Sequence, residues 1–252
     1  LNNARLFDQT QTALQRQTAS ADILRVISQS PTDVMPVVEV IVSTARRLLG
    51  CYRTGFLRRE GETLVSLSHA TAEGVAPGLA GRIPLDAAHN FPARALVSRA
   101  LLHIPDWSAI ELPEHEQNIS RLTGTRSSLL LPLLRGADQE ALGVLTFQRD
   151  KPEPFSDADI ALAQSFADQA VIAIENVRLF NETKEALERQ TATADVLKVI
   201  SQSPTDVQPV FDAIAERARV LCNAQVSGVT RFDGTLVHLV AFHGVSPEAE
   251  QA

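Results

Sequence analysis

The sequence is short of several residue types, and each shortage limits what the protein can be. It contains two cysteines, Cys51 and Cys222, which are too few for a disulfide framework and fit the reducing cytoplasm. No apolar run is long enough to span a bilayer. The net charge of −7 argues against a nucleic-acid partner, because phosphate binding needs a basic surface. We therefore expect a cytoplasmic protein with no nucleic-acid partner and no membrane segment in this stretch.

The sequence also lacks the patterns of common enzyme and metal sites. It has no glycine-rich phosphate loop, no His-Glu-x-x-His zinc motif and no paired-cysteine metal site. Residues 124–128 superficially suggest an anion-binding turn, but we favour a loop that leads into a core strand. Ser127 and Ser128 have no evident histidine partner, which argues against nucleophilic catalysis. We predict that this chain is not itself an enzyme.

What the sequence does contain is a long internal repeat. Residues 3–34 return as residues 176–207, with 23 of 32 positions identical at a constant offset of 173. Such a repeat indicates an array of similar modules. Residues 226–242 also resemble residues 53–70, with a one-residue slip near the turn. We expect an incoming signalling helix at 1–30, a complete domain at 31–176, a connecting signalling helix at 177–203 and the truncated start of a second domain at 204–252.

The connector is predicted to be one long helix. Residues 160–200 contain no proline or glycine. Ser156 is placed to cap the helix, with Asp157 and Asp159 in its first turn, where the helix dipole favours acids. Apolar or small residues recur mostly at steps of three, four or seven, as in a coiled coil; they are Phe166, Ala170, Ala173, Val177, Phe180, Leu187, Ala194 and Leu197.

A helix of roughly 45 residues is about 70 Å long, which is more than one small domain can cover. We therefore expect a homodimer in which two such helices pair in parallel. Lys184, Thr191 and Lys198 interrupt the apolar stripe, and such breaks locally unwind a coiled coil. A monomeric helix packed on its own domain is the alternative.

A second helix is predicted to follow each copy of the repeat, at 37–49 and 210–221. Residues 30–33 and 203–206 share a helix-start pattern, with a serine cap, a proline in the first helical position and an acid two residues later. Pro36 and Pro209 come soon afterwards, so a later start of each helix stays open.

Residues 50–149 predict an antiparallel sheet. A hairpin turn is expected at Glu60-Gly61, and its counterpart in the second copy at Asp233-Gly234. A short helix is expected at 93–99. Segments 71–85 and 110–122 are expected to be irregular or polar. The expected strands are 54–58, 63–69, 101–104, 128–134 and 142–148. The fold class is α+β, with helices on one face of the sheet and long loops on the other.

Several strings, in this order, resemble the GAF domain family: residues 101–106 (LLHIPD), 124–133 (GTRSSLLLPL), 142–145 (LGVL), 155–159 (FSDAD) and the closing helix 166–176. The repeated connector resembles those between tandem GAF domains of bacterial sensor histidine kinases and nucleotide cyclases. The resemblance implies a sensory module of a cytoplasmic signal-transduction protein, such as a two-component system, with its output domain outside this chain.

The resemblance also bears on cofactors. Cyclic-nucleotide-binding GAF domains carry Asn-Lys … Phe-x-x-x-Asp-Glu. Here the run is Asp150-Lys151 … Phe155-x-x-x-Asp159-Ile160, which lacks the Asn and Glu but leaves Lys151 and Asp159 to form an ion pair. A bilin would need a cysteine within 71–125, and that stretch has none. His89, His103 and His115 fall where the family builds its pocket, but nothing supplies a second ligand for haem or metal. The cofactor is therefore unknown.

Six residues are candidates for a small-molecule site, because they combine apolar walls with a few polar groups: Phe91, Arg94, Asp106, Trp107, Arg126 and Ser128. Trp107 as a core anchor and Arg94 as a solvated charge are the alternative interpretations. The module would sense a ligand or partner and signal through a dimeric helix. A ligand-free dimerisation spacer is the competing hypothesis, and a cavity of about 300 Å³ or more would separate the two.

Overall fold

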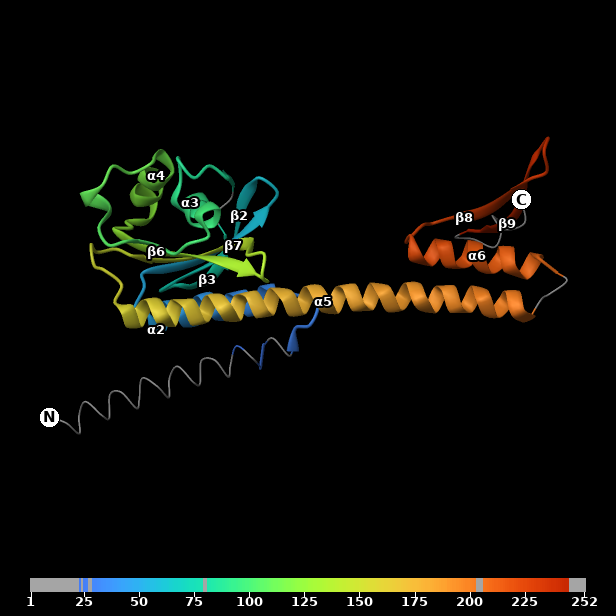
Figure 1. The fold of residues 1–252 in the computed structure, drawn as a ribbon, viewed down its shortest axis with the longest axis horizontal. Coiled ribbons are helices and arrows are strands. Elements are labelled where there is room, and N and C mark those ends of the chain that lie inside the picture. Colours follow the sequence, from blue (N-terminus) through green and yellow to red (C-terminus); the bar gives the residue numbers. More distant parts are fainter. Residues whose placement is uncertain (1–22, 24, 27–28, 79–80, 203–205, 245–252) are drawn as a thin grey trace. The chain divides into compact units, whose positions relative to one another are not determined.

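The computed structural model describes residues 23, 25–26, 29–78, 81–202 and 206–244 (Figure 1). The chain divides into two units, Leu1–Leu179 and Phe180–Ala252. The predicted incoming helix at 1–30 lies mostly outside the described residues. The predicted domain boundaries at 31–176, 177–203 and 204–252 stay predictions.

The first unit contains an antiparallel sheet of seven strands. Six of them follow the order β3-β2-β1-β7-β6-β5, and β4 pairs with β2. The five predicted strands are confirmed. The segment 71–85, which was expected to be irregular, contributes the two short strands β3 and β4. The strands are β1 (Arg53–Glu60), β2 (Thr63–Thr71), β3 (Gly74–Pro77), β4 (Arg82–Pro84), β5 (Leu102–Ile104), β6 (Ser127–Arg135) and β7 (Glu140–Arg149).

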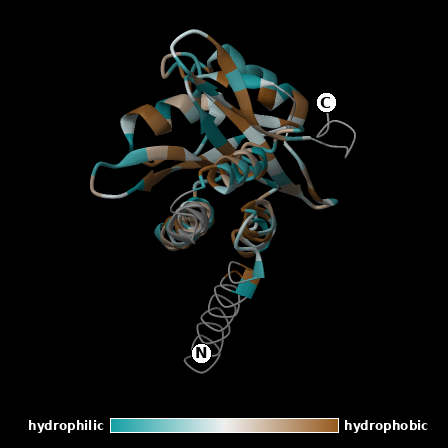
Figure 2. Cartoon of the chain, turned by 90° about the vertical axis from the view of Figure 1, so that its right-hand side faces the viewer, coloured by the Kyte–Doolittle hydropathy of each residue, from teal (hydrophilic) through white to brown (hydrophobic). Residues whose placement is uncertain are grey.

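Two long helices, α2 (Met35–Leu48) and α5 (Asp157–Gln202), lie side by side against one face of this sheet (Figures 1 and 2). Alternate residues of the strands point towards them, among them Phe56 and Leu131, which are almost fully buried. Burial of one such side chain contributes roughly 1.5–3 kcal/mol. The helix α5 meets the sheet with small residues, which lets the two backbones approach closely; these are Ala163, Ala167, Ala170 and Ala173.

The opposite face of the sheet is covered by shorter elements: α3 (Phe91–Ser98), the 3-10 turn η1 (Trp107–Ala109) and α4 (Glu114–Thr123). The helix α3 confirms the one predicted at 93–99, whereas α4 forms within a segment that was read only as polar. Asn90 caps α3 by accepting a hydrogen bond from the Ala93 N–H at 2.7 Å. A second, smaller apolar cluster lies under these elements. The protein is therefore α+β, as the sequence predicted.

Both predicted second helices begin later than the serine-proline pattern suggested. The helix α2 begins at Met35, and its first N–H donates to Asp33 Oδ1 at 2.9 Å. In α6 (Gln208–Leu221), the Gln208 N–H donates to Asp206 Oδ1 at the same distance. Ser30 therefore does not cap α2. Asp33 instead accepts from the first N–H of the helix, and Pro36 in the first turn has no N–H that needs a partner.

The long helix α5 forms as predicted. Ser156 Oγ accepts from the Asp159 N–H at 3.2 Å, and Asp159 Oδ2 accepts from the Ser156 N–H at 3.0 Å. This reciprocal pair is a capping box with aspartate in place of glutamate. The helix continues without a break past Thr183 to Gln202. Among the described residues, no helix is both long and apolar enough to cross a membrane.

The described part of the second unit consists of the end of α5, α6 and the hairpin of β8 (Ser227–Phe232) and β9 (Val237–His243). Ser227 Oγ donates to the Ala215 carbonyl of α6. Gly228 pairs with Phe242 as Gly55 pairs with His69 in β1 and β2. The two hairpins thus correspond at the constant offset of 173, without the slip expected from the sequence.

Candidate functional site

A cavity of about 400 Å³ lies between the sheet of the first unit and the elements α3, η1 and α4. Its floor consists of strand residues that point away from α2 and α5, because neighbouring residues of a strand face opposite sides. These floor residues are Arg53, Gly55 and Leu57 of β1, Ser66 and His69 of β2, Ser128 and Leu130 of β6, and Thr146 and Gln148 of β7.

Phe91, Trp107 and Ser128, three of the six predicted site residues, line this cavity together. The Trp107 Nε1–H donates to Ser128 Oγ at 2.9 Å, and its backbone N–H donates to the Arg126 carbonyl at 2.7 Å. The rings of Phe91 and Trp107 meet edge to face, with centroids 5.7 Å apart. Trp107 is therefore both anchored in the core and part of the cavity wall.

The other three predicted residues do not line the cavity. Arg94 Nε donates to the Ala87 carbonyl at 3.0 Å, and the guanidinium lies over the Phe91 ring. Asp106 caps η1 by accepting from the Ser108 N–H at 2.8 Å. The Arg126 carbonyl accepts from the Trp107 N–H of η1, and the Arg126 N–H donates to the Arg149 carbonyl at the end of β7 at 2.8 Å. These residues hold the wall, and a binding role for them stays a prediction.

Glu116 of α4 lines the cavity and was not singled out from the sequence. Its side chain is 2% exposed, and Oε1 accepts from the Phe91 N–H at 2.8 Å. Oε2 is buried and has no partner among the described residues. Burial raises the pKa of this carboxyl to about 7. No local pattern predicts this, because the polar segment 110–122 is buried only through contacts with α3, far away in the sequence.

The histidines divide between the cavity and the rest of the unit. His69 and His115 line the cavity, and burial lowers the pKa of both. His69 was not singled out from the sequence, so its place in the floor was missed. His89 instead pairs with Asp86, and His103 Nε2 accepts from the Phe155 N–H at 3.0 Å. The described residues contain no cluster of three or more potential metal ligands.

A sequence model of the GAF domain matches residues 33–174, which is more than half of the chain. The chain belongs to the GAF domain family. GAF domains are sensory and regulatory modules and are generally non-catalytic. The cavity occupies the face of the GAF sheet that α2 and α5 leave open.

Known proteins with this fold serve different systems. A dual 3′,5′-cyclic-AMP and -GMP phosphodiesterase 11A of Takifugu rubripes is 27% identical over 128 residues, which cover 49% of this chain but only 14% of that enzyme. Residues 122 to 287 of a methyl-accepting chemotaxis protein are 25% identical, with a TM-score of 0.53 over 62% of this chain and 97% of that one. A bacteriophytochrome of R. palustris shares the fold at 15% identity, with a TM-score of 0.62 over 91% and 50%.

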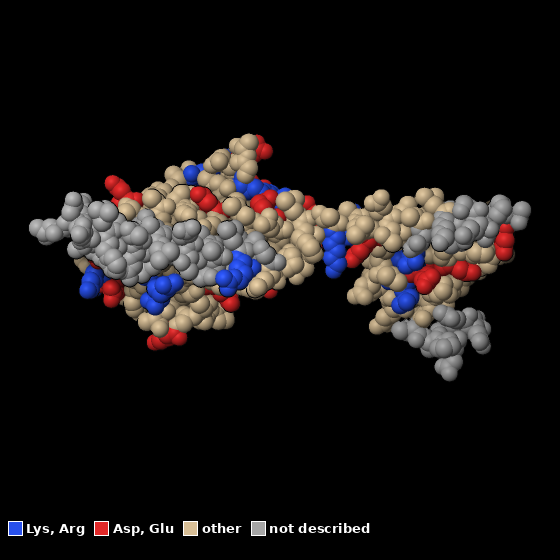
Figure 3. Space-filling view, turned by 90° about the horizontal axis from the view of Figure 1, so that it is seen from below, with Lys and Arg blue, Asp and Glu red and all other residues tan. Residues whose placement is uncertain are grey.

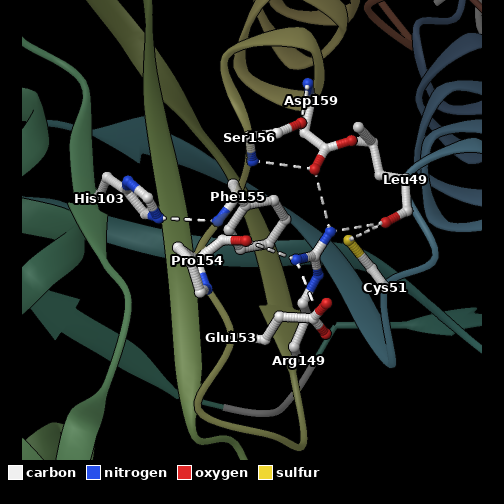
Figure 4. A network of polar contacts seen from close by, with 9 residues as sticks. All are labelled: Leu49, Cys51, His103, Arg149, Glu153, Pro154, Phe155, Ser156 and Asp159. Carbon is white, nitrogen blue, oxygen red and sulfur yellow. Dashed lines mark hydrogen bonds and ion pairs between the residues drawn. The ribbon is translucent and has the colours of Figure 1, made fainter.

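A polar network surrounds Arg149, at the position of the cyclic-nucleotide pattern (Figure 4). The guanidinium donates to the Leu49 carbonyl at 3.2 Å, the Pro154 carbonyl at 2.9 Å and Asp159 Oδ2 at 3.2 Å. It also lies over the Phe155 ring. Asp159 thus forms its ion pair with Arg149. The sequence had suggested Lys151 as its partner instead. Arg149 reaches Asp159 from the end of β7, whereas Lys151 lies on the exposed loop beyond it.

The segment 124–128 is a loop that leads into a strand, as favoured from the sequence. Gly124 ends α4 with a positive φ of 73°, and its N–H donates to the Ser120 carbonyl at 2.9 Å. Thr125 and Ser127 are buried below it. The backbone of this segment therefore has a structural role.

Proposed function

We propose that this GAF module is the sensory part of a cytoplasmic signal-transduction protein, and that it binds a small molecule in its cavity. The single observation that carries the proposal is the cavity of about 400 Å³, which has apolar and aromatic walls and a few polar groups. Such a volume and lining are typical of small-molecule sites. A ligand-free spacer would instead fill its centre with its own side chains.

The Arg149 network supports a route from the cavity to α5. Gln148 lines the cavity, and Arg149 is the next residue of β7. The Arg149 guanidinium donates to the Leu49 carbonyl at the end of α2 and to Asp159 in the first turn of α5. A ligand that favours one arrangement of β7 would therefore bias the start of α5. Only a ligand with different affinities for the two arrangements can drive such a shift.

The helix α5 supports signalling through a homodimer. Its apolar stripe is covered by the sheet as far as Ala173, which is 1% exposed. Along the same stripe, Phe180 is 44% and Leu187 is 62% exposed. In the proposed dimer, a parallel partner helix covers these side chains. The resemblance of the connector to those of histidine kinases and nucleotide cyclases favours such an output domain.

The face drawn in Figure 3 agrees with a protein or small-molecule partner. Among the described residues visible on this face, acidic and basic side chains are interspersed, and the basic ones do not gather into a patch. Nucleic acid would need such a patch.

Ligand binding is tested by filling the cavity. Thr146→Phe places a ring in the floor, and Thr230→Phe makes the same change on an exposed strand residue of β8. We expect native mass spectrometry of the chain purified from its own host to find a bound small molecule. Thr146→Phe should lose it and Thr230→Phe should keep it. Wild-type protein that carries no added mass and melts at the same temperature with and without a host metabolite extract would favour the spacer.

Dimerisation is tested on the exposed part of the stripe. Replacing Leu187 and Ala194 together by Asp places two buried charges in the proposed helix pair, which should dissociate the dimer. Light scattering measures the mass in solution. A wild-type chain that is already monomeric at tens of micromolar would remove the first step of the signalling scheme.

A further inference from the structure

The Arg53 guanidinium is a charge in the cavity that no carboxylate of the described residues neutralises. Arg53 opens β1, opposite Gln148 of β7, and its side chain lines the cavity floor. Among the described residues, no carboxylate forms an ion pair with it. Burial lowers its pKa from the ordinary value, so part of its hydration has already been lost. An unpaired, partly desolvated guanidinium is a strong binding group for an anion.

The remaining titratable groups in the wall leave the cavity with an excess of positive charge. Arg82 is already paired with Glu60 Oε2 at 3.0 Å. Glu116 is the one carboxyl in the lining, and burial favours its neutral form. His69 and His115 are held towards their neutral forms by burial, and Arg53 adds to this effect at His69. Glu116 is therefore only partly ionised near neutral pH, and no carboxylate is among the groups that shift the pKa of Arg53, so an anionic ligand would meet a net positive charge there.

The rest of the lining selects an apolar body. Leu57 and Leu130 of the floor and Phe91 and Trp107 of the opposite wall present mostly hydrocarbon. Ser128 Oγ already accepts from Trp107, so one of the polar atoms at the floor is engaged. This arrangement fits a molecule with one charged end and an apolar remainder.

Building on the proposed function, we infer that the ligand of this cavity is a small organic carboxylate with an apolar body, whose carboxylate binds the Arg53 guanidinium. The planar fork of the guanidinium matches two carboxylate oxygens at once. Trp107 and Phe91 contact the apolar body.

The second copy of the hairpin supports the assignment. At the offset of 173, Arg53 corresponds to Val226 and His69 to Phe242. The register pairs His69 with Gly55 and Phe242 with Gly228, so these two residues lie at equivalent positions, and Val226 directly precedes β8. A hairpin of this kind therefore forms without an arginine at the position of Arg53 or a histidine at the position of His69.

The test uses matched pairs of acid and neutral amide as probes: acetate and acetamide, benzoate and benzamide, 3-phenylpropionate and 3-phenylpropionamide. The chain has one tryptophan, and it lies in the cavity wall, so its fluorescence reports occupancy. The whole chain is titrated as wild type, Arg53→Gln, Arg53→Lys and Arg59→Gln. Arg59 is exposed on the same strand and outside this cavity, so it controls for general charge.

We expect at least one acid to bind wild type about tenfold or more tightly than its amide. Arg53→Gln should remove that preference, Arg53→Lys should retain part of it, and Arg59→Gln should leave it unchanged. Thermal melting of each variant checks that the fold is kept.

Two results would overturn the inference alone: amides that bind as tightly as their acids, or an acid preference that survives Arg53→Gln. If no acid and no amide changes the fluorescence even at millimolar concentration, the cavity does not admit small molecules. The proposed function then fails together with the inference.

Discussion

The two copies of the helix-and-hairpin unit, 33–71 and 206–243, share their strand register but differ in how far their apolar side chains are buried. Both start their helix with an aspartate that accepts from the N–H two residues later. In both, a strand hydroxyl donates to a helix carbonyl: Thr54 to Val42, and Ser227 to Ala215. Equivalent local hydrogen bonds therefore form in both copies. We call the helix and hairpin that they hold together the frame.

The apolar packing around the two copies is very different. Phe56 is 1% exposed in the first unit, whereas its counterpart Val229 is only half-buried. The second hairpin also presents large apolar side chains on its surface: Phe232, Leu236, Val237 and Leu239. The second copy thus keeps the same strand register with much less apolar burial around it. A lone hairpin is marginally stable in water.

The largest expected difference between the copies is in core truncation. Phe56→Ala should destabilise the first unit by about 3–5 kcal/mol, through lost burial and the cavity left behind. Val229→Ala should cost under about 1 kcal/mol, because that side chain buries less area. Urea unfolding followed by Trp107 fluorescence measures the first, and hydrogen exchange in β8 and β9 measures the second. Equal losses at the two positions would break the comparison.

The second prediction concerns Glu116, which has no counterpart in the described part of the second unit. Its pKa of about 7 in the folded state lies above the ordinary value of 4.5. The folded state therefore holds the proton more tightly, and this contribution is fully present below pH 4.5 and is lost as the pH rises through about 7.

Glu116→Gln removes this titration. The wild type should lose on the order of 3 kcal/mol between these two pH values, and the variant should lose much less. Urea unfolding at a series of pH values measures it. Glu114→Gln, an exposed residue of the same helix, is the control. A variant whose stability falls with pH as steeply as that of the wild type would show that Glu116 does not titrate in this window.

The third prediction compares the strand hydroxyls. Thr54→Val removes a buried hydrogen bond to the Val42 carbonyl with little change in shape, so we expect a loss of about 1 kcal/mol. Ser227→Ala should cost less, since Ser227 is half-exposed and water can replace its bond to Ala215. Denaturant midpoints and hydrogen exchange measure the two. A larger loss of stability at Ser227 than at Thr54 would contradict the argument that the more buried hydrogen bond contributes more.

The smallest expected effect, and the one that should be equal in both copies, is at the helix starts. Asp33→Ala and Asp206→Ala each remove one acceptor for an exposed first-turn N–H, at about 0.5–1 kcal/mol. Exchange rates of the first amides of α2 and α6 measure it. A loss confined to one copy would show that the two helix starts are not equivalent.

The sequence predicted most of the fold because the signals were local. The apolar runs at 128–134 and 142–148 located β6 and β7, and Ser156 with the acids that follow it located the start of α5. It missed β3 and β4, which are too short to show a period and are defined by their pairing with β2. Of the six residues predicted for the site, Phe91, Trp107 and Ser128 line the cavity, and their role in binding stays a prediction.

It missed Arg53, His69 and Glu116 as cavity residues for a related reason. Each has the local pattern of a surface residue or an ordinary strand residue. Each enters the cavity only because another element, distant in the sequence, covers it: Glu116 reaches the Phe91 N–H across 25 positions. Burial of this kind has no local period to detect.

By itself, the sequence determined that there are two copies of one frame, the α+β class and a long helix between the copies, because caps, turns and periodic apolar residues act over a few positions. Only the tertiary structure decided which polar groups share the cavity and which ion pair seats α5. Asp159 pairs with Arg149 and not with Lys151, because the packing of the first turn of α5 beside the end of β7 sets which cation it reaches, and spacing in the sequence does not fix that packing.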